Sequence, residues 1–180
     1  MDPHLRHTAR VATIHGIPVH VGWSTLVVAV AIALLGPFAP AQDTLNAVAY
    51  LLIVGVHEAG HAWVVRRRGH HVDAITVHMT HGACMYHGID VTPLDRALIA
   101  WGGVAAQALL AIAASVPLAV FGHVPVLEVL VVINLSIAAF NLLPFPGRDG
   151  EDAWTLFRLL EEQGATRAWA KRHRDRPRHR

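Results

Sequence analysis

The sequence contains little charge for its length. Only 16% of its 180 residues are Asp, Glu, Lys or Arg, whereas 53% are hydrophobic. Soluble globular domains usually contain about a quarter charged residues, so this composition argues against an ordinary soluble fold. A protein embedded in a membrane is the better expectation.

Cysteine is also scarce, and the pattern of a nucleic-acid-binding surface is missing. Cys84 is the single cysteine, which excludes an internal disulfide framework. The sequence pI is near 9.2. However, the basic residues cluster at the ends of apolar runs and at the end of the chain, and they do not alternate with aromatic residues. This distribution predicts contact with an anionic membrane surface and no nucleic-acid partner.

Long apolar runs are what the sequence does have. Four of them are interpreted as membrane-spanning helices, at 22–38, 45–65, 94–121 and 126–143. If the N-terminus is cytoplasmic, all 15 Lys and Arg residues fall on the cytoplasmic side, and the two short outer loops have none. We therefore expect a mainly α-helical integral membrane protein of a bacterial cell membrane, with both termini in the cytoplasm.

An alternative stays open for the first run. Its basic flank, its stretch TLVVAVAIALL and the Ala-Pro-Ala that follows at 39–41 also resemble a cleavable signal peptide. An uncleaved span is favoured because the polar segment ahead of the run is long for a signal. Four spans also account for the basic residues without cleavage.

The segment between the second and third runs is too polar to cross a membrane. Its stretch 74–80, AITVHMT, alternates between apolar and polar residues, which is typical of a half-buried strand. A strand beside a membrane needs a partner. We therefore expect a small sheet or hairpin at the cytoplasmic face, continuing to Asp90. An open edge along 74–80 would hold an extended substrate by strand addition.

The fourth run ends in a break. Residues 140–151, FNLLPFPGRDGE, contain two prolines and two glycines, so the helix must stop there and leave Asp149 on irregular backbone at the membrane edge. Residues 151–170 are then predicted to form an amphipathic cytoplasmic helix. Its apolar side carries three large residues, Trp154, Phe157 and Leu160.

The second run contains three polar side chains that are costly in a membrane. His57 and His61 are four residues apart, so on a helix they project from one face and can bind the same metal ion. Glu58 is rotated from His57 by about 100 degrees, which suits it to hold a water molecule. A catalytic zinc site takes three protein ligands. Asp149 is the best candidate for the third, because the helix break places it on the same side of the membrane.

Simpler explanations exist for these residues. The His-Glu-x-x-His pattern also occurs as ordinary surface polarity on soluble helices, and Asp149 could be a turn residue before a glycine. Inside a membrane helix the first explanation weakens, since ionisable groups there are costly and usually functional. A second cluster with three-residue spacing comprises His78, His81, Cys84 and His87. On a strand the first two would face opposite ways, so polar loop residues are favoured over a second metal site.

Taken together, these motifs resemble the site-2 protease family of intramembrane zinc metalloproteases, in its compact sporulation-type branch. HEAGH at 57–61 and NLLPFPGRDG at 141–150 are similar to the two signatures of that family. GIPVHVGWS resembles the stretch before the first helix in this branch, and WGGVAAQ, at 101–107, resembles the glycine-rich start of its third helix. The resemblance implies that the three candidate ligands bind zinc and that Glu58 is the catalytic acid and base. It also implies that Asn141 positions the substrate or stabilises the oxyanion.

The sequence departs from the family pattern at three places. Arg148 and the glycine before it stand where the family has Pro-Leu, Glu151 replaces a second glycine, and Gly103 replaces a proline. The chain has no room for the PDZ or nucleotide-sensing domains of many relatives. We therefore expect one metalloprotease domain over 1–170 and a basic cytoplasmic tail, 171–180, without fixed structure.

The predicted function is hydrolysis of a peptide bond within or next to a transmembrane segment. Zinc activates a water molecule, and Glu58 takes its proton and returns it to the leaving amine. The expected partners are a membrane protein or membrane-bound peptide substrate, the lipid bilayer and a regulatory partner in trans. Two other classes stay open. One is a membrane metal transporter, which the 14 histidines would fit. The other is a catalytically idle membrane scaffold that retains the metal site, although the intact Glu58 argues against it.

Overall fold

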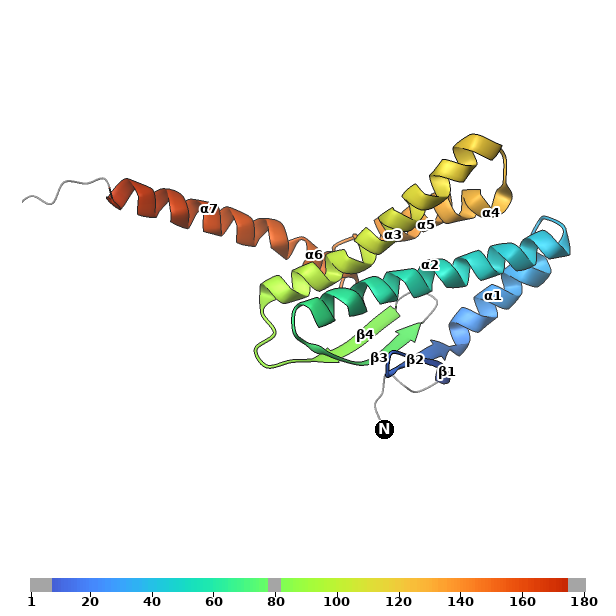
Figure 1. The fold of residues 1–180 in the computed structure, drawn as a ribbon, viewed down its shortest axis with the longest axis horizontal. Helices are drawn as coiled ribbons and strands as arrows, with labels where there is room; N and C mark the ends of the chain where they lie inside the picture. The colour runs from blue at the N-terminus through green and yellow to red at the C-terminus, as the bar shows by residue number, and fades with distance from the viewer. Residues whose placement is uncertain (1–7, 78–81, 175–180) are drawn as a thin grey trace, which may run out of the picture.

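The computed structural model describes residues 8–77 and 82–174, and Figure 1 shows their arrangement. Over these residues the chain is mainly helical and contains a small four-stranded sheet, in agreement with the predicted fold class. The elements follow in the order β1 (Thr8–Ile14), β2 (Ile17–Gly22), α1 (Trp23–Leu35), α2 (Pro40–Arg67), β3 (His71–Val77), β4 (Gly82–His87), α3 (Pro93–Phe121), α4 (Pro125–Glu128), η2 (Val129–Ile133), α5 (Asn134–Asn141), α6 (Asp149–Ala153) and α7 (Thr155–Arg174).

The helix α2 lies at the centre of the fold, and its ends carry the usual sequence signals. Pro40 takes the first position, where a missing N–H costs nothing, and Asp43 lies in the first turn. Arg66 and Arg67 lie in the last turn, and Gly69, with a φ of 82°, turns the chain towards β3. Contacts with α1 and α3 bury much of the helix.

Two helices of the described residues, α2 and α3, are long and apolar enough to cross a membrane. A soluble core helix would be mostly buried, but only 17% of the most apolar window of α3 is buried, so its apolar side chains face outwards. This pattern supports membrane association. The other two apolar helices, Trp23–Leu35 and Pro125–Asn141, are shorter, so the count of four spans stays a prediction.

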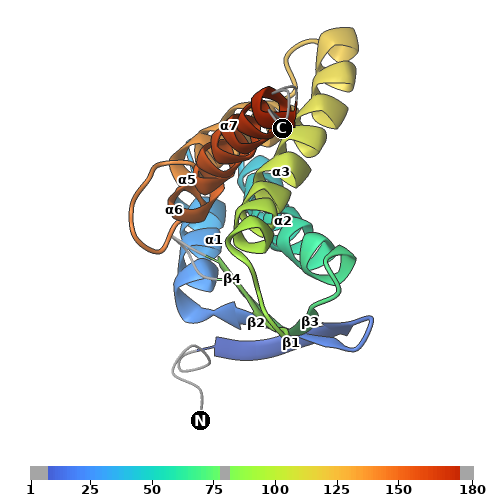
Figure 2. The ribbon, with the colours of Figure 1, turned by 90° about the vertical axis from the view of Figure 1, so that its left-hand side faces the viewer.

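The sheet joins two antiparallel hairpins in the order β1-β2-β3-β4, and Figure 2 shows it below the helices. The central pair, β2 and β3, is parallel, with Val19 opposite Ile75. The hairpin of β3 and β4 agrees with the predicted one between the second and third runs. The N-terminal hairpin of β1 and β2 was not predicted.

The position of β3 corrects the open edge that was expected along 74–80. The strand has a partner on each side, so its main chain cannot accept a substrate strand. Residues 74–77 are all buried and do not alternate, since β3 is central and packs against the helices. The Thr25 hydroxyl of α1 donates to the Val77 carbonyl at 3.0 Å. Residues 78–80 lie outside the described residues, and the edge strands of the sheet are β1 and β4.

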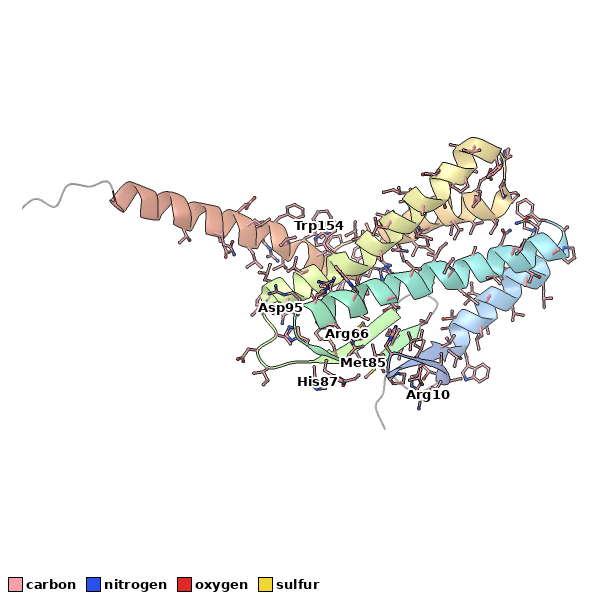
Figure 3. The ribbon with its side chains drawn as sticks, in the orientation of Figure 1. Arg10, Arg66, Met85, His87, Asp95 and Trp154 are labelled. Atoms are coloured by element: carbon pink, nitrogen blue, oxygen red, sulfur yellow. The ribbon has the colours of Figure 1, made fainter. Side chains whose placement is uncertain are left out.

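The end of α2 is tied to the beginning of α3. Thr92 and Asp95 form a capping box at the start of α3, and Arg68 Nε donates to Asp95 Oδ1 at 2.6 Å. Figure 3 shows Asp95 beside the end of α2. Further along, Gly60 and Gly102 lie so close that a Cβ on either would collide with the main chain of the other helix. These contacts fix α2 and α3 relative to each other.

The single helix predicted at 151–170 is divided in the structure into α6 and α7, and α7 extends away from the other helices in Figure 1. The expected amphipathic character is not found, since α7 does not separate apolar from polar residues onto two faces. Trp154, which directly precedes α7, and Phe157 in its first turn form an aromatic cluster with Trp101 of α3. The helix continues to Arg174 and therefore crosses the expected domain boundary at 170. The domain division stays a prediction.

Candidate metal centre

Three potential metal ligands converge where α6 meets α2. His57 and His61 project from α2, and Asp149 is the first residue of α6, directly after the irregular loop that follows α5. The Nε2 atoms of the two histidines are 3.0 Å apart. The Asp149 carboxylate lies 3.1 Å from His57 Nε2 and 3.3 Å from His61 Nε2. Among the described residues, this is the group of three that could hold a metal ion, and it consists of the three residues that the sequence singled out.

The geometry fits one metal ion. Ligand atoms bound tetrahedrally to zinc lie roughly 3.3 Å from one another, close to the separations found here. Gly103 of α3 faces the two histidines, and a Cβ there would collide with His61 Nε2 and His57 Cε1. The glycine thus leaves space beside the ligand atoms. Two imidazoles and one carboxylate are a donor set that catalytic zinc uses.

Hydrogen bonds on the far side of each imidazole orient the two rings. His57 Nδ1 donates to Gln107 Oε1 at 2.9 Å, and His61 Nδ1 donates to the Ile99 carbonyl at 2.7 Å. Asn134 Nδ2 in turn donates to the Gln107 carbonyl at 2.8 Å. With Nδ1 engaged, each ring directs Nε2 towards the centre. Neither amide was predicted to support the site. The sequence did contain a clue to both residues. Each is a polar amide within an apolar run, where a polar group is costly and usually functional.

Loss of the Gln107 acceptor should weaken the metal centre. We expect Gln107→Leu to lower the affinity for zinc about 10- to 100-fold, because the His57 ring is no longer fixed. Gln107→Glu keeps an acceptor and should retain most of the affinity. Gln42→Leu removes an amide that bonds Asn46 in the first turns of α2 and serves as the matched control. Competition titrations with a chelator measure the affinities, and equal values for Gln107→Leu and the unmodified chain would contradict this role.

Two tryptophans hold the segment that carries Asp149. Trp154 Nε1 donates to the Leu142 carbonyl at 2.7 Å, which ties α6 to the end of α5. Trp101 Nε1 of α3 donates to the Ala153 carbonyl at 3.0 Å. Figure 3 shows Trp154 where α6 meets α3. These bonds position Asp149 although the preceding loop is irregular.

The surroundings of Asp149 keep it ionised. Burial opposes the charge, but hydrogen bonds with His57 and His61 outweigh this effect and hold the pKa of the Asp149 carboxyl below its ordinary range. The group is therefore a carboxylate at neutral pH. This is the protonation state that binds a metal ion.

Glu58 and Asn141 lie beside the three potential ligands. The Glu58 side chain is 1% exposed, and its Oε1 is 3.9 Å from His57 Nε2. Within the described residues, neither Glu58 oxygen has a hydrogen-bond partner. A buried carboxylate without a donor is costly, so this position suits a group that acts on a bound molecule. Asn141 Nδ2 lies 3.4 Å from His57 Nε2. The catalytic roles of both residues stay predictions.

The second cluster of potential ligands gains no support. His78 and His81 lie outside the described residues, and His87 is exposed. Burial raises the pKa of the Cys84 thiol to about 12, with a smaller contribution from the charge of Glu58. A thiol that stays protonated is a poor ligand. β4 also contacts α2, the helix that carries His57 and His61.

The fold is shared with a protease of known structure. The chain is similar to the site-2 protease from Methanocaldococcus jannaschii, with a TM-score of 0.68 and 21% sequence identity over 87% of this chain and 72% of that chain. No family model matches the sequence, and no curated protein matches it. The chain therefore has the fold of a site-2 protease, in agreement with the resemblance of its motifs.

Proposed function

We propose that this protein is an intramembrane zinc metalloprotease that cuts a peptide bond within or next to a transmembrane segment of a membrane protein. The observation that carries the proposal is the convergence of His57, His61 and Asp149 beside the buried, unpartnered Glu58. This arrangement lies in a fold shared with a site-2 protease. A surface His-Glu-x-x-His pattern would not bring an aspartate from a distant helix to the same point.

The residues of the site divide the chemistry among them. His57, His61 and Asp149 hold the zinc, which when bound supplies the Lewis acidity that activates water and polarises a peptide carbonyl. Glu58 accepts the proton of the attacking water and passes it to the leaving amine. The Asn141 amide donates to the substrate carbonyl or to the negative charge that develops on it.

We further propose that β4 holds the substrate in place of β3. A helical segment hides its peptide bonds in hydrogen bonds and must unwind before attack. β4 is an edge strand, and it contacts α2, the helix that carries Glu58. An unwound substrate can therefore pair with β4 through its main chain, largely independent of its sequence.

The proposed location is a bacterial cell membrane, with α2 and α3 across the bilayer and both termini in the cytoplasm. Arg66, Arg67 and Arg68 lie at the end of α2 that meets the sheet. Cytoplasmic loops are rich in such residues, so we place the sheet and α7 on the cytoplasmic side. A site near that end of α2 is within reach of water. The proposed partners are a membrane-bound substrate, the lipid bilayer and a regulatory partner in trans.

Removal of zinc is expected to abolish cleavage reversibly. The experiment uses the full chain in liposomes with a membrane-spanning peptide, before and after a chelator and after zinc is restored, with metal content measured in parallel. Cleavage should follow the zinc content, because both the activated water and the polarised carbonyl depend on the metal. Cleavage by metal-free protein would contradict the proposal. Zinc entry into the liposomes without cleavage would instead favour a transporter, and neither activity would favour an idle scaffold.

A further inference from the structure

A positive charge beside the candidate metal centre lacks a counter-ion. Arg148 directly precedes Asp149, and its Nη1 atom is buried without a hydrogen-bond partner in the part of the chain that the structure describes. None of the described carboxylates forms an ion pair with its guanidinium. A charged donor that is buried without an acceptor is energetically unfavourable. An acceptor from another molecule would relieve this cost.

The acidic residues that follow Arg148 are already engaged. Asp149 faces the two histidines, and Glu151 accepts a hydrogen bond of 3.0 Å from a main-chain N–H of the preceding turn. Asp152 pairs with Arg96 of α3, with 3.5 Å between Oδ1 and Nε. The charge of Arg148 is therefore uncompensated although three carboxylates lie close by in the chain.

The ring of Phe140 holds the guanidinium in place. Arg148 Cζ lies 3.6 Å from the centroid of this ring, a cation–π contact. Phe140 directly precedes Asn141, as Arg148 directly precedes Asp149. Each member of the contact is therefore next in sequence to a residue whose side chain lies at the candidate metal centre. The contact holds the guanidinium against Phe140 near the end of α5.

We propose that Arg148 binds an acidic side chain of the substrate, close to the peptide bond that is cut. This inference rests on the proposed protease function. A guanidinium matches a carboxylate through two parallel N–H donors, and Arg148 is partly exposed as a whole although its Nη1 atom is covered. A peptide carbonyl carries no net charge and would leave the cation uncompensated. The substrate class is therefore membrane segments with Asp or Glu beside the cleavage site.

The test measures binding separately from cleavage. Full-length Glu58→Gln protein, with zinc bound and in liposomes, is titrated with fluorescent membrane peptides in which Asp or Glu is moved along the region of the cut. Each is compared with the matching Asn or Gln peptide. An acidic residue at one or more positions should tighten binding about tenfold or more. Adding Arg148→Gln should remove this difference and leave the affinity for the amide peptide unchanged.

Two further variants separate charge recognition from a structural role. Arg158→Gln removes an equal charge from α7, where the side chain donates to Thr155, and should preserve the preference for acidic peptides. Arg148→Glu should reverse it in favour of a peptide with Lys at the same position. Equal binding of acidic and amide peptides, equal weakening of both by Arg148→Gln, or no binding of any peptide would each overturn the proposal. Failure of the proposed protease function would give a different result. The unmodified chain, which retains Glu58, would prefer the acidic peptide but would leave it uncut.

Discussion

Glu58→Gln is expected to keep its zinc and its fold but to cut a membrane peptide about 10² to 10⁴ times more slowly. Glutamine has nearly the shape of glutamate, but its amide cannot take a proton from water. Glu58 is also further from His57 Nε2, at 3.9 Å, than the Asp149 carboxylate is, so the metal ligands stay in place. Turnover in liposomes and zinc content by elemental analysis check both parts of this result.

The control for this variant is Glu161→Gln, which makes the same chemical change at an exposed position on α7. It should cut the peptide at the rate of the unmodified chain. If Glu58→Gln cut nearly as fast as this control, Glu58 would not be the proton acceptor. If Glu58→Gln lost its zinc, the residue would be a ligand and the assignment of roles would need revision.

Asp149→Ala should lose most of its zinc and, with it, cleavage. Loss of a hydrogen-bond partner of a metal ligand typically lowers metal affinity about 10- to 100-fold. Loss of the ligand itself should therefore lower it by more than about 100-fold. The two histidines would be left close together without the carboxylate that now faces both of them. Metal analysis after dialysis against a weak chelator gives the occupancy.

Asp152→Ala is the matched control, since it removes a carboxylate from the same short helix. That side chain is half exposed and pairs with Arg96, an interaction worth no more than about 1 kcal/mol at a surface. Its zinc content should therefore equal that of the unmodified chain. Tight, full occupancy in Asp149→Ala would contradict the assignment of the third ligand.

Local spacing accounts for what could be predicted from the sequence. His57, Glu58 and His61 lie within two turns of one helix, so the helical period alone sets their relation. The break before Asp149 follows from the prolines and glycines around it, and the hairpin of β3 and β4 is formed by neighbouring segments. The fold class, the elements that carry the site and the meeting of its three potential ligands could therefore be predicted.

The features that were missed depend on segments far apart in the chain. The pairing of Val19 with Ile75 turns β3 into a central strand, and nothing in the alternation of 74–80 distinguishes a central strand from an edge. The contacts of Gln107 and Gly103 with the histidines likewise arise from the way α3 packs on α2. Residue spacing gives the face of a helix, but it does not give the neighbour that the face meets.

The parallel pairing of β2 with β3 also constrains the order in which the protein assembles. The two strands lie on either side of α1 and α2 in the chain, so they can pair only after these helices have brought them to the same end of the structure. Such a contact closes a long loop, which makes it entropically costly and slow to form. We therefore expect completion of the sheet to be a late event in folding, with the β2-facing edge of β3 unpaired until then.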